Sequence, residues 1–124
     1  MASSLSFVRL VADTAGESHF GVQHVDIVTS SFAPPAPPFG VSAMTPASEC
    51  GFLQVPRGWI GELHPSPSRM WVFLLSGTME FETSDGGRRR IAPGTAMLLE
   101  DTAGKGHLSR VVGDTDAVFA VVKL

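Results

Sequence analysis

The chain has 124 residues, of which 44% are hydrophobic and 17% are charged, and its formal net charge is -3 at pH 7. A chain of this length forms one domain and is too short to hold a cofactor domain beside a substrate domain. The acidic balance excludes the basic field that draws proteins onto phosphate backbones, so nucleic acid is not an expected partner.

The N-terminal stretch and the cysteine content bear on location. Residues 1–20 contain no charged region followed by a long apolar run, and no segment approaches the roughly 18 apolar residues of a membrane span. Cys50 is the single cysteine, so it cannot form an internal disulfide or a thiolate metal cluster. These features predict a soluble, cytoplasmic protein without a membrane partner.

Short apolar runs separated by turns predict strands along most of the chain. The 13 glycines and 9 prolines lie between these runs, and no stretch has a sustained helical period. Strands are expected at residues 25–29, 51–55, 71–76, 78–83, 96–101, 109–112 and 117–122. This many short strands in so small a chain indicates a sandwich or a barrel.

Residues 1–50 are expected to pack on the barrel as an N-terminal strand and a Pro-rich strap. The segment 32–40 reads FAPPAPPFG, and proline lacks the donor that a central strand needs. It is predicted to lie as a rigid strap over an apolar face, with recruitment of an aromatic-groove domain as the alternative.

The clearest local signal is the hairpin within residues 76–90. Met79 and Phe81 alternate with glutamates, which predicts one buried face and one wet face. Residues 84–87 supply Asp-Gly turn chemistry, so the chain reverses there. The arginines at 88–90 are predicted to form a solvated edge opposite the glutamates rather than an anion site.

Two strands are apolar on both faces, at residues 71–75 and 117–122. Their inner faces can fill the core, but their outer faces also need cover. A second sheet, the N-terminal segment or another subunit can supply it. A homodimer is the simplest supplier and is therefore predicted.

Familiar catalytic motifs are absent from the sequence. The four histidines are His19, His24, His64 and His107. They form no H-x-H pair and no H-E-x-x-H helix, and no serine lies in a nucleophile elbow. The stretch before His107 superficially resembles a phosphate loop, but Leu99 stands where that loop requires glycine, so Lys105 is predicted to be a surface residue.

The remaining spacings resemble the cupin superfamily of small β-barrels, and in particular uncharacterised single-domain bacterial proteins of that type. Gly58, His64 and Gly77 match positions of the first cupin motif. The second motif opens with a Pro-Gly turn and ends in a histidine, matched here by 93–94 and His107. The resemblance implies an all-β, antiparallel jelly-roll barrel in one domain, with residues 51–124 as its core.

The chain departs from the family at the metal ligands. Ser66 replaces the second histidine, Met70 replaces the glutamate, and Glu100 replaces a proline of the second motif. Metal-binding cupins hold Fe, Mn, Ni or Zn with three histidines and a carboxylate, whereas this chain offers His64 and His107. Without an anionic ligand, these two histidines are predicted to form only a weak, incomplete metal site.

A small-ligand pocket is predicted inside the barrel instead. Its expected lining consists of His64, Ser66, Met70, Val72 and His107. Alternate residues of a strand share a face, so Trp71 and Phe73 are expected to point outward. A lone histidine on a strand can equally be a hydrogen-bonded wall residue, and that alternative stays open for His64.

Glu100 and His107 are the candidate catalytic residues. Adjacent strand residues face opposite ways, so at most one of Glu100 and Asp101 looks into the barrel. A carboxylate paired there with His107 can transfer protons. Alternatively, Asp101 with Thr102 satisfies backbone donors in the loop before His107.

Three functions remain open. The preferred one is binding or processing of an unassigned small molecule in the barrel, with an incomplete metal site. The second is a metal-dependent isomerase, lyase or dioxygenase that uses His64 and His107. The third is a non-catalytic binding or structural module, so the sequence leaves open whether the protein is an enzyme.

Overall fold

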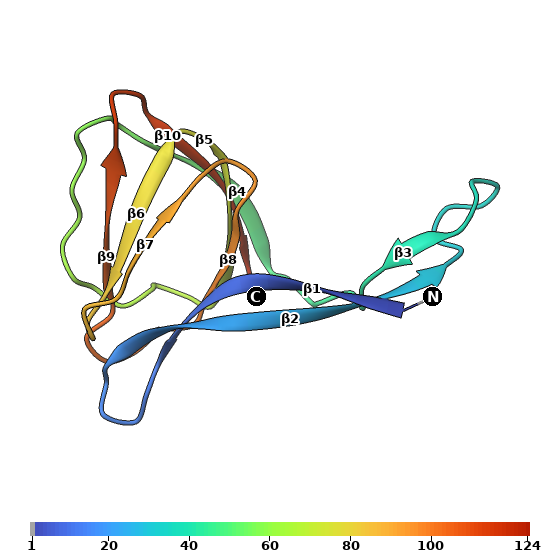
Figure 1. The fold of residues 1–124 in the computed structure, drawn as a ribbon, viewed down its shortest axis with the longest axis horizontal. Helices are drawn as coiled ribbons and strands as arrows, with labels where there is room; N and C mark the ends of the chain where they lie inside the picture. The colour runs from blue at the N-terminus through green and yellow to red at the C-terminus, as the bar shows by residue number, and fades with distance from the viewer. Residues whose placement is uncertain (1) are drawn as a thin grey trace.

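The computed structural model describes residues 2–124, which form ten strands and no helix (Figure 1). The strands are β1 (Ala2–Ala12), β2 (Ser18–Ser30), β3 (Phe39–Val41), β4 (Glu49–Val55), β5 (Met70–Ser76), β6 (Thr78–Thr83), β7 (Arg88–Ile91), β8 (Ala96–Leu99), β9 (His107–Val112) and β10 (Ala117–Lys123). Within this part of the chain, no helix exists that is long and apolar enough to cross a membrane.

The strands form two sheets around one core. The larger sheet has the order β3-β2-β1-β8-β5-β10-β4, and the smaller has the order β7-β6-β9. Neighbouring strands run antiparallel except β1 and β8, which pair in parallel at Val8–Leu10 and Met97–Leu99. The all-β, jelly-roll-like fold is confirmed, although the two sheets are not hydrogen-bonded into one closed ring.

Alternating apolar residues of both sheets fill the space between them. On β5, Met70, Val72 and Leu74 are buried, whereas Phe73 and Leu75 are exposed on the outer face. The same period of two runs along β6 and β9. The predicted inward and outward positions of β5 are therefore confirmed, because each residue follows the pleat.

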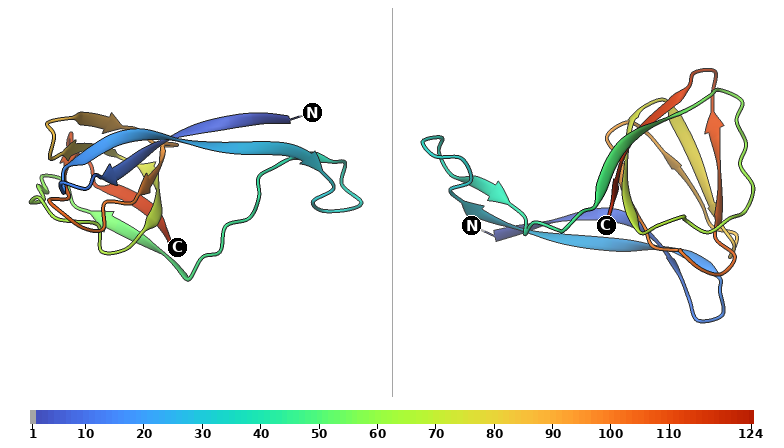
Figure 2. Two further views of the ribbon diagram at one scale, coloured as in Figure 1. Left: turned by 90° about the horizontal axis from the view of Figure 1, so that it is seen from below. Right: turned by 180° about the vertical axis from the view of Figure 1, so that it is seen from behind.

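The N-terminal hairpin is much longer than the sequence indicates. Strands β1 and β2 pair from Ala2–Val28 to Ala12–Ser18. Near its turn the hairpin joins the barrel, where Leu10 is fully buried in the core. Its other half, with β3, extends away from the barrel as an arm (Figures 1 and 2).

The Pro-rich segment lies at the far end of this arm and does not pack over the barrel of its own chain. Residues 31–40 are exposed throughout. Because β1 and β2 stay paired along their full length, they carry this segment outward (Figure 2). The strap prediction is therefore wrong for this chain taken alone, while the division at residue 50 stays a prediction.

The outer face of β5 receives part of its cover from the arm. Phe7 of β1 contacts Trp71 edge-on, with ring centroids 5.6 Å apart, and Trp71 stacks on Phe73. Phe73 and Leu75 remain exposed, as does Phe52 on the edge strand β4. The N-terminal segment thus covers one end of the doubly apolar surface and leaves the rest open.

Candidate functional site

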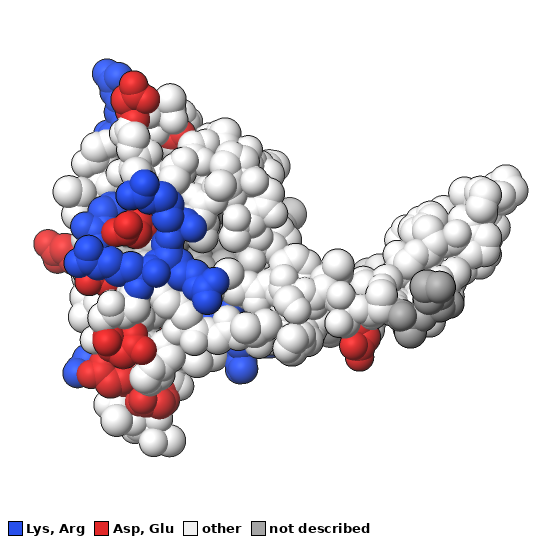
Figure 3. Space-filling model, viewed as in Figure 1, with Lys and Arg blue, Asp and Glu red and all other residues white. Residues whose placement is uncertain are grey.

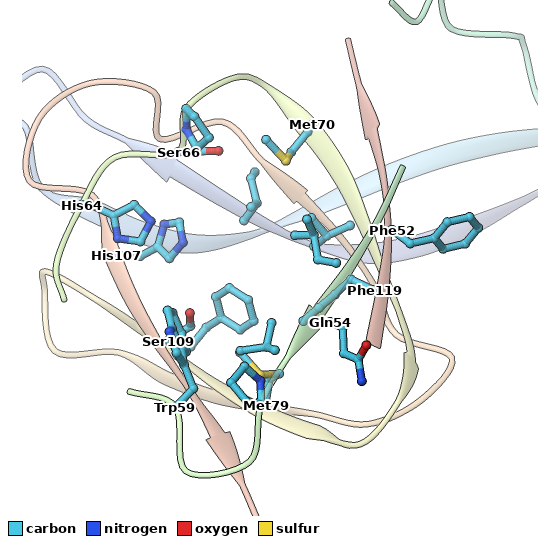
Figure 4. A pocket seen from close by; sticks show the side chains of 17 residues that line it. Phe52, Gln54, Trp59, His64, Ser66, Met70, Met79, His107, Ser109 and Phe119 are labelled. Carbon is cyan, nitrogen blue, oxygen red and sulfur yellow. The ribbon is translucent and has the colours of Figure 1, made fainter. Parts of the chain in front are cut away.

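A pocket of about 540 Å³ opens between the two sheets beside β4 (Figure 4). Residues 52–56 form one wall, and buried side chains of β5, β6, β8, β9 and β10 form the interior. The loop after β4 contributes Trp59, His64, Ser66 and Pro67. Ligand sites of proteins commonly enclose roughly 300–1,000 Å³ behind mainly apolar walls, and this pocket fits that description.

His107, the first residue of β9, is held by a buried carboxylate. Its Nδ1 atom lies 2.6 Å from Oδ2 of Asp101, and both side chains are buried. Because an ionised carboxylate only accepts hydrogen bonds, the Nδ1 atom carries the proton and donates it. The lone pair of neutral His107 therefore sits on Nε2, on the edge of the ring away from Asp101.

Among residues 2–124, His107 is the one side chain that forms a hydrogen bond with the carboxylate of Asp101. Its second oxygen, Oδ1, is buried and makes no hydrogen bond within that part of the chain. A buried anion is costly unless a donor or a positive charge lies beside it. The hydrogen bond from His107 therefore compensates the carboxylate of Asp101 and fixes the orientation of the imidazole ring.

Two glycines allow the loop 102–106 to return the chain to this pair. Gly104 and Gly106 both have positive φ angles, 81° and 75°. A Cβ atom at Gly106 would lie 2.0 Å from the carbonyl carbon of His64. Only glycine permits this close approach, which brings the loop of His64 against the start of β9.

His64 lies beside His107 on a loop rather than on a strand. The two residues form an isolated bridge in which each main-chain nitrogen donates to the other's carbonyl oxygen at 3.0 Å. Their ring centroids are 5.3 Å apart. Nδ1 of His64 donates to the carbonyl oxygen of Glu62 at 2.7 Å, so its Nε2 atom also carries the lone pair.

The strand alternation expected from His64 onward holds only from Met70, where β5 begins. Pro65 and Pro67 lack the amide hydrogen that a strand ladder needs, so the chain stays irregular before that point. Even so, the predicted residues His64, Ser66, Met70, Val72 and His107 all line this one pocket (Figure 4).

Glu100 lies outside the pocket and does not reach His107. Its carboxylate accepts hydrogen bonds from Arg9 and from Nε of Arg69, the latter at 2.6 Å. Partial burial raises the pKa of Glu100, but the two arginines outweigh this effect and hold the pKa below its ordinary value of 4.5. Asp101, one residue further and on the opposite face, takes the place that was expected of Glu100.

The residues present do not fit the metal that the family resemblance implies. No group of three or more histidine, cysteine or acidic side chains within residues 2–124 could hold an ion. Ser66 is neutral and its hydroxyl donates to the carbonyl oxygen of Ser68 at 2.7 Å. Met70 offers a soft thioether, and the carboxylate of Asp101 is bonded to the far edge of His107, so only two imidazole nitrogens remain.

Several pocket residues were not predicted from the sequence. Among them are Trp59 and Ser109, with the aromatic pair Phe81 and Phe119, whose rings meet edge-on at 6.4 Å. Ser109 follows from the alternation of β9 once His107 is placed inward. Trp59 gives no such signal, because its position depends on the irregular loop whose main chain is hydrogen-bonded to β9.

Comparison with known proteins supports the fold. No protein-family model matches the chain, and no curated protein matches it. The cupin domain of Schizosaccharomyces pombe Cnp3 superposes with a TM-score of 0.50 at 14% identity, covering 86% of this chain and 72% of that domain. The chain therefore has a cupin-like fold, as its motif spacings indicate.

Two bacterial structures also align with the chain. Protein NMB1881 of Neisseria meningitidis gives a TM-score of 0.44 at 17% identity, covering 60% of this chain and 71% of that one. The conserved SPY1581 protein of unknown function from Streptococcus pyogenes gives a TM-score of 0.47 at 25% identity, covering 67% of this chain and 70% of that one.

Proposed function

We propose that the protein binds a small, mainly apolar molecule in the pocket and that His107 exchanges a proton with it. The observation that carries this proposal is the buried Asp101–His107 pair, joined at 2.6 Å, with its imidazole on the pocket wall. A concave apolar site with a few convergent polar atoms is the usual design of a ligand site. An imidazole held by a carboxylate is the usual design of a general base.

In this proposal Asp101 is a positioning residue and His107 is the base. Asp101 keeps the proton of neutral His107 on Nδ1, so Nε2 is free to accept a proton from the ligand. The resulting imidazolium is stabilised by the adjacent carboxylate, and the proton can be returned to another atom of the same ligand. General base catalysis of this kind typically contributes roughly 10²–10⁴-fold to a rate.

Imidazole NMR spectra test the first step. The spectra of the free protein are expected to show His64 and His107 protonated at Nδ1. Titration with a library of neutral aromatic fragments is expected to shift Nε2 of His107 but not the ring of the distant His24. If no fragment shifts any residue of the pocket, the proposal fails.

Substitutions test the chemistry. Asp101→Asn is expected to disturb the tautomer of His107 while the pocket still binds fragments, because an amide can donate as well as accept. Unchanged His107 spectra in this variant would contradict the role given to Asp101. If fragments bind to the pocket but no bound ligand exchanges a proton with His107, in the unaltered chain or in Asp101→Asn, the result favours the non-catalytic alternative.

The metal-dependent alternative has no observation in its favour beyond the two histidines. We expect protein purified without added metal to carry less than one transition metal per chain, because two neutral ligands hold a divalent ion weakly. Elemental analysis that finds about one Fe, Mn, Ni or Zn per chain would overturn this expectation. A cytoplasmic location likewise stays a prediction.

We also propose that the protein is a homodimer. Phe52 and Phe73 flank Ala120 on the outer face of the larger sheet, and both phenylalanines are exposed. A patch of this kind can pair with its own copy across a twofold axis. We expect the unaltered chain to have the mass of a dimer at low micromolar concentration, and we expect Phe73→Glu to shift the protein toward monomer. A monomeric mass for the unaltered chain would contradict the proposal.

A further inference from the structure

Formal charges are absent from the pocket lining. None of the nine lysines and arginines is among the lining residues, and no aspartate or glutamate is either. In Figure 3 the charged side chains gather over the small sheet, where Arg88, Arg90 and Arg110 pair with Glu80 and Glu82. A charged ligand would therefore meet no opposite formal charge on the pocket wall.

The hydrogen-bond donors near the pocket are mostly in use. The hydroxyl of Ser66 donates to Ser68, and Nε2 of Gln54 donates to Asp116 at 3.1 Å. Both histidines donate through Nδ1 to partners behind them. What they offer the pocket in their neutral forms is the lone pair on each Nε2 atom.

Ser109 supplies a further polar group. It is buried on β9, two residues after His107 and on the same face, and it lines the pocket. Its hydroxyl makes no hydrogen bond within residues 2–124, so that hydroxyl can turn to donate or to accept. The polar set is thus two imidazole acceptors and one adaptable hydroxyl, with the indole N–H of Trp59 as a further donor on the pocket wall.

Aromatic rings surround this polar set. Phe81 lies 5.6 Å from the His107 ring by centroids and meets Phe119 edge-on. Trp59 lies on the loop wall (Figure 4). Flat rings favour a flat apolar ligand, since aromatic pairs gain from edge-on and offset contacts.

From these observations we propose that the ligand of this pocket is an uncharged aromatic molecule with a phenol-type hydroxyl. The hydroxyl donates to Nε2 of His107 or His64, and its oxygen accepts from Ser109. The aromatic body lies among the rings of Trp59, Phe81 and Phe119. This inference rests on the proposed function, and it adds the class of ligand.

Carboxylates and ethers are rejected for different reasons. A carboxylate would bring an anion toward two lone pairs with no formal cation on the wall to compensate it. An ether would leave the imidazole nitrogens without a donor, and a site built for a hydroxyl rejects the analogue that lacks it. A matched series of ligands can separate these effects from plain apolar burial.

The test compares 2-naphthol, 2-methoxynaphthalene and 2-naphthoate by calorimetry at about pH 8, where an ordinary imidazole is neutral and a phenol is protonated. We expect 2-naphthol to bind roughly tenfold more tightly than the ether and at least tenfold more tightly than the carboxylate. The side chain of His64 is exposed. In the His64→Ala variant, the preference for 2-naphthol over the ether should shrink. His24→Ala is the matched control and should leave all three affinities unchanged, because His24 lies outside the pocket.

The outcomes separate this inference from the proposed function. If the ether or the naphthoate binds as tightly as the naphthol, the pocket binds aromatic molecules but the phenol inference is overturned. If neither His64→Ala nor the milder His107→Gln alters the preference for the naphthol, the inference is also overturned. If neither the naphthalene series nor the neutral fragments perturb the pocket, the proposed function itself fails.

Discussion

Replacing His107 by alanine is predicted to destabilise the fold more than replacing Asp101 by alanine. The carboxylate of Asp101 is fully buried and forms its side-chain hydrogen bond with His107. His107→Ala therefore leaves a buried anion without compensation. Breaking a buried pair in this way costs about 3–5 kcal/mol. The second change leaves a neutral imidazole on the pocket wall and removes one hydrogen bond to a charged group, which costs about 1.5–3 kcal/mol.

The double substitution is predicted to cost less than the sum of the two single ones. It removes the anion together with its partner, so the penalty of an unpaired charge disappears. Residues in direct contact typically show interaction energies of about 0.5–3 kcal/mol. The free energy of unfolding, measured in urea at neutral pH through tryptophan fluorescence, gives all four corners of the cycle.

His24→Ala is the control for this cycle. Within residues 2–124 the side chain of His24 makes one exposed hydrogen bond, to Ser6, so its loss should change stability by less than about 0.5 kcal/mol. The reasoning is refuted if His107→Ala costs less than about 1 kcal/mol, or if the two single costs add. Either result would mean that Asp101 does not depend on His107 for its charge compensation.

Two further predictions concern the turns. Gly77→Ala is expected to cost more than Gly58→Ala in urea unfolding. Both glycines have φ of 79°, for which a side chain costs about 1–2 kcal/mol, but only at Gly77 would the new Cβ lie 2.5 Å from a main-chain oxygen. Equal losses would contradict this. The second concerns His19, whose ring bonds Asp13 at 2.6 Å and Asp85 at 2.8 Å. The pKa of His19 is raised above 6.5, chiefly by the hydrogen bond to Asp13 and next by the one to Asp85. The pKa of Asp85 is lowered to about 2 by the hydrogen bonds that it accepts from Thr83, Gly87 and His19. His19→Gln should therefore lower Tm most between about pH 4 and 6; the difference should fade as pH rises through the raised pKa of His19 and as it falls toward the lowered pKa of Asp85. A difference that grows above pH 7 would refute it.

The barrel could be predicted because its signals are local. Every expected strand overlaps an observed one, and the Asp-Gly hairpin, the Pro-Gly turn and the inward face of β5 need only the period of two and positive-φ glycines. The arginines at 88–90 also form the predicted solvated edge, with Arg88 and Arg90 beside glutamates of β6.

The arm and the loop could not be predicted because their structure depends on distant partners. Strand β1 is polar near its start, where it is held by its pairing with β2, and β8 joins it only at residues 8–10. Residues 56–69 have no period of their own, and they are placed by main-chain bonds to β9. Neither the pairing of β1 nor that of residues 56–69 produces a pattern that can be recognised in a single sequence.

The carboxylate that meets His107 belongs to Asp101 and not to its neighbour Glu100, which was the expected partner. The two residues are adjacent and follow the end of β8 at Leu99, yet their carboxylates have different partners. Glu100 meets two arginines outside, and Asp101 meets one histidine inside. The carboxylate of Asp101 cannot be a third metal ligand beside the two Nε2 atoms, because it is bonded to the opposite edge of the His107 ring. With Ser66 and Met70 in the other ligand positions, the chemistry that we propose for this cupin-like pocket is proton exchange at an imidazole nitrogen rather than metal catalysis.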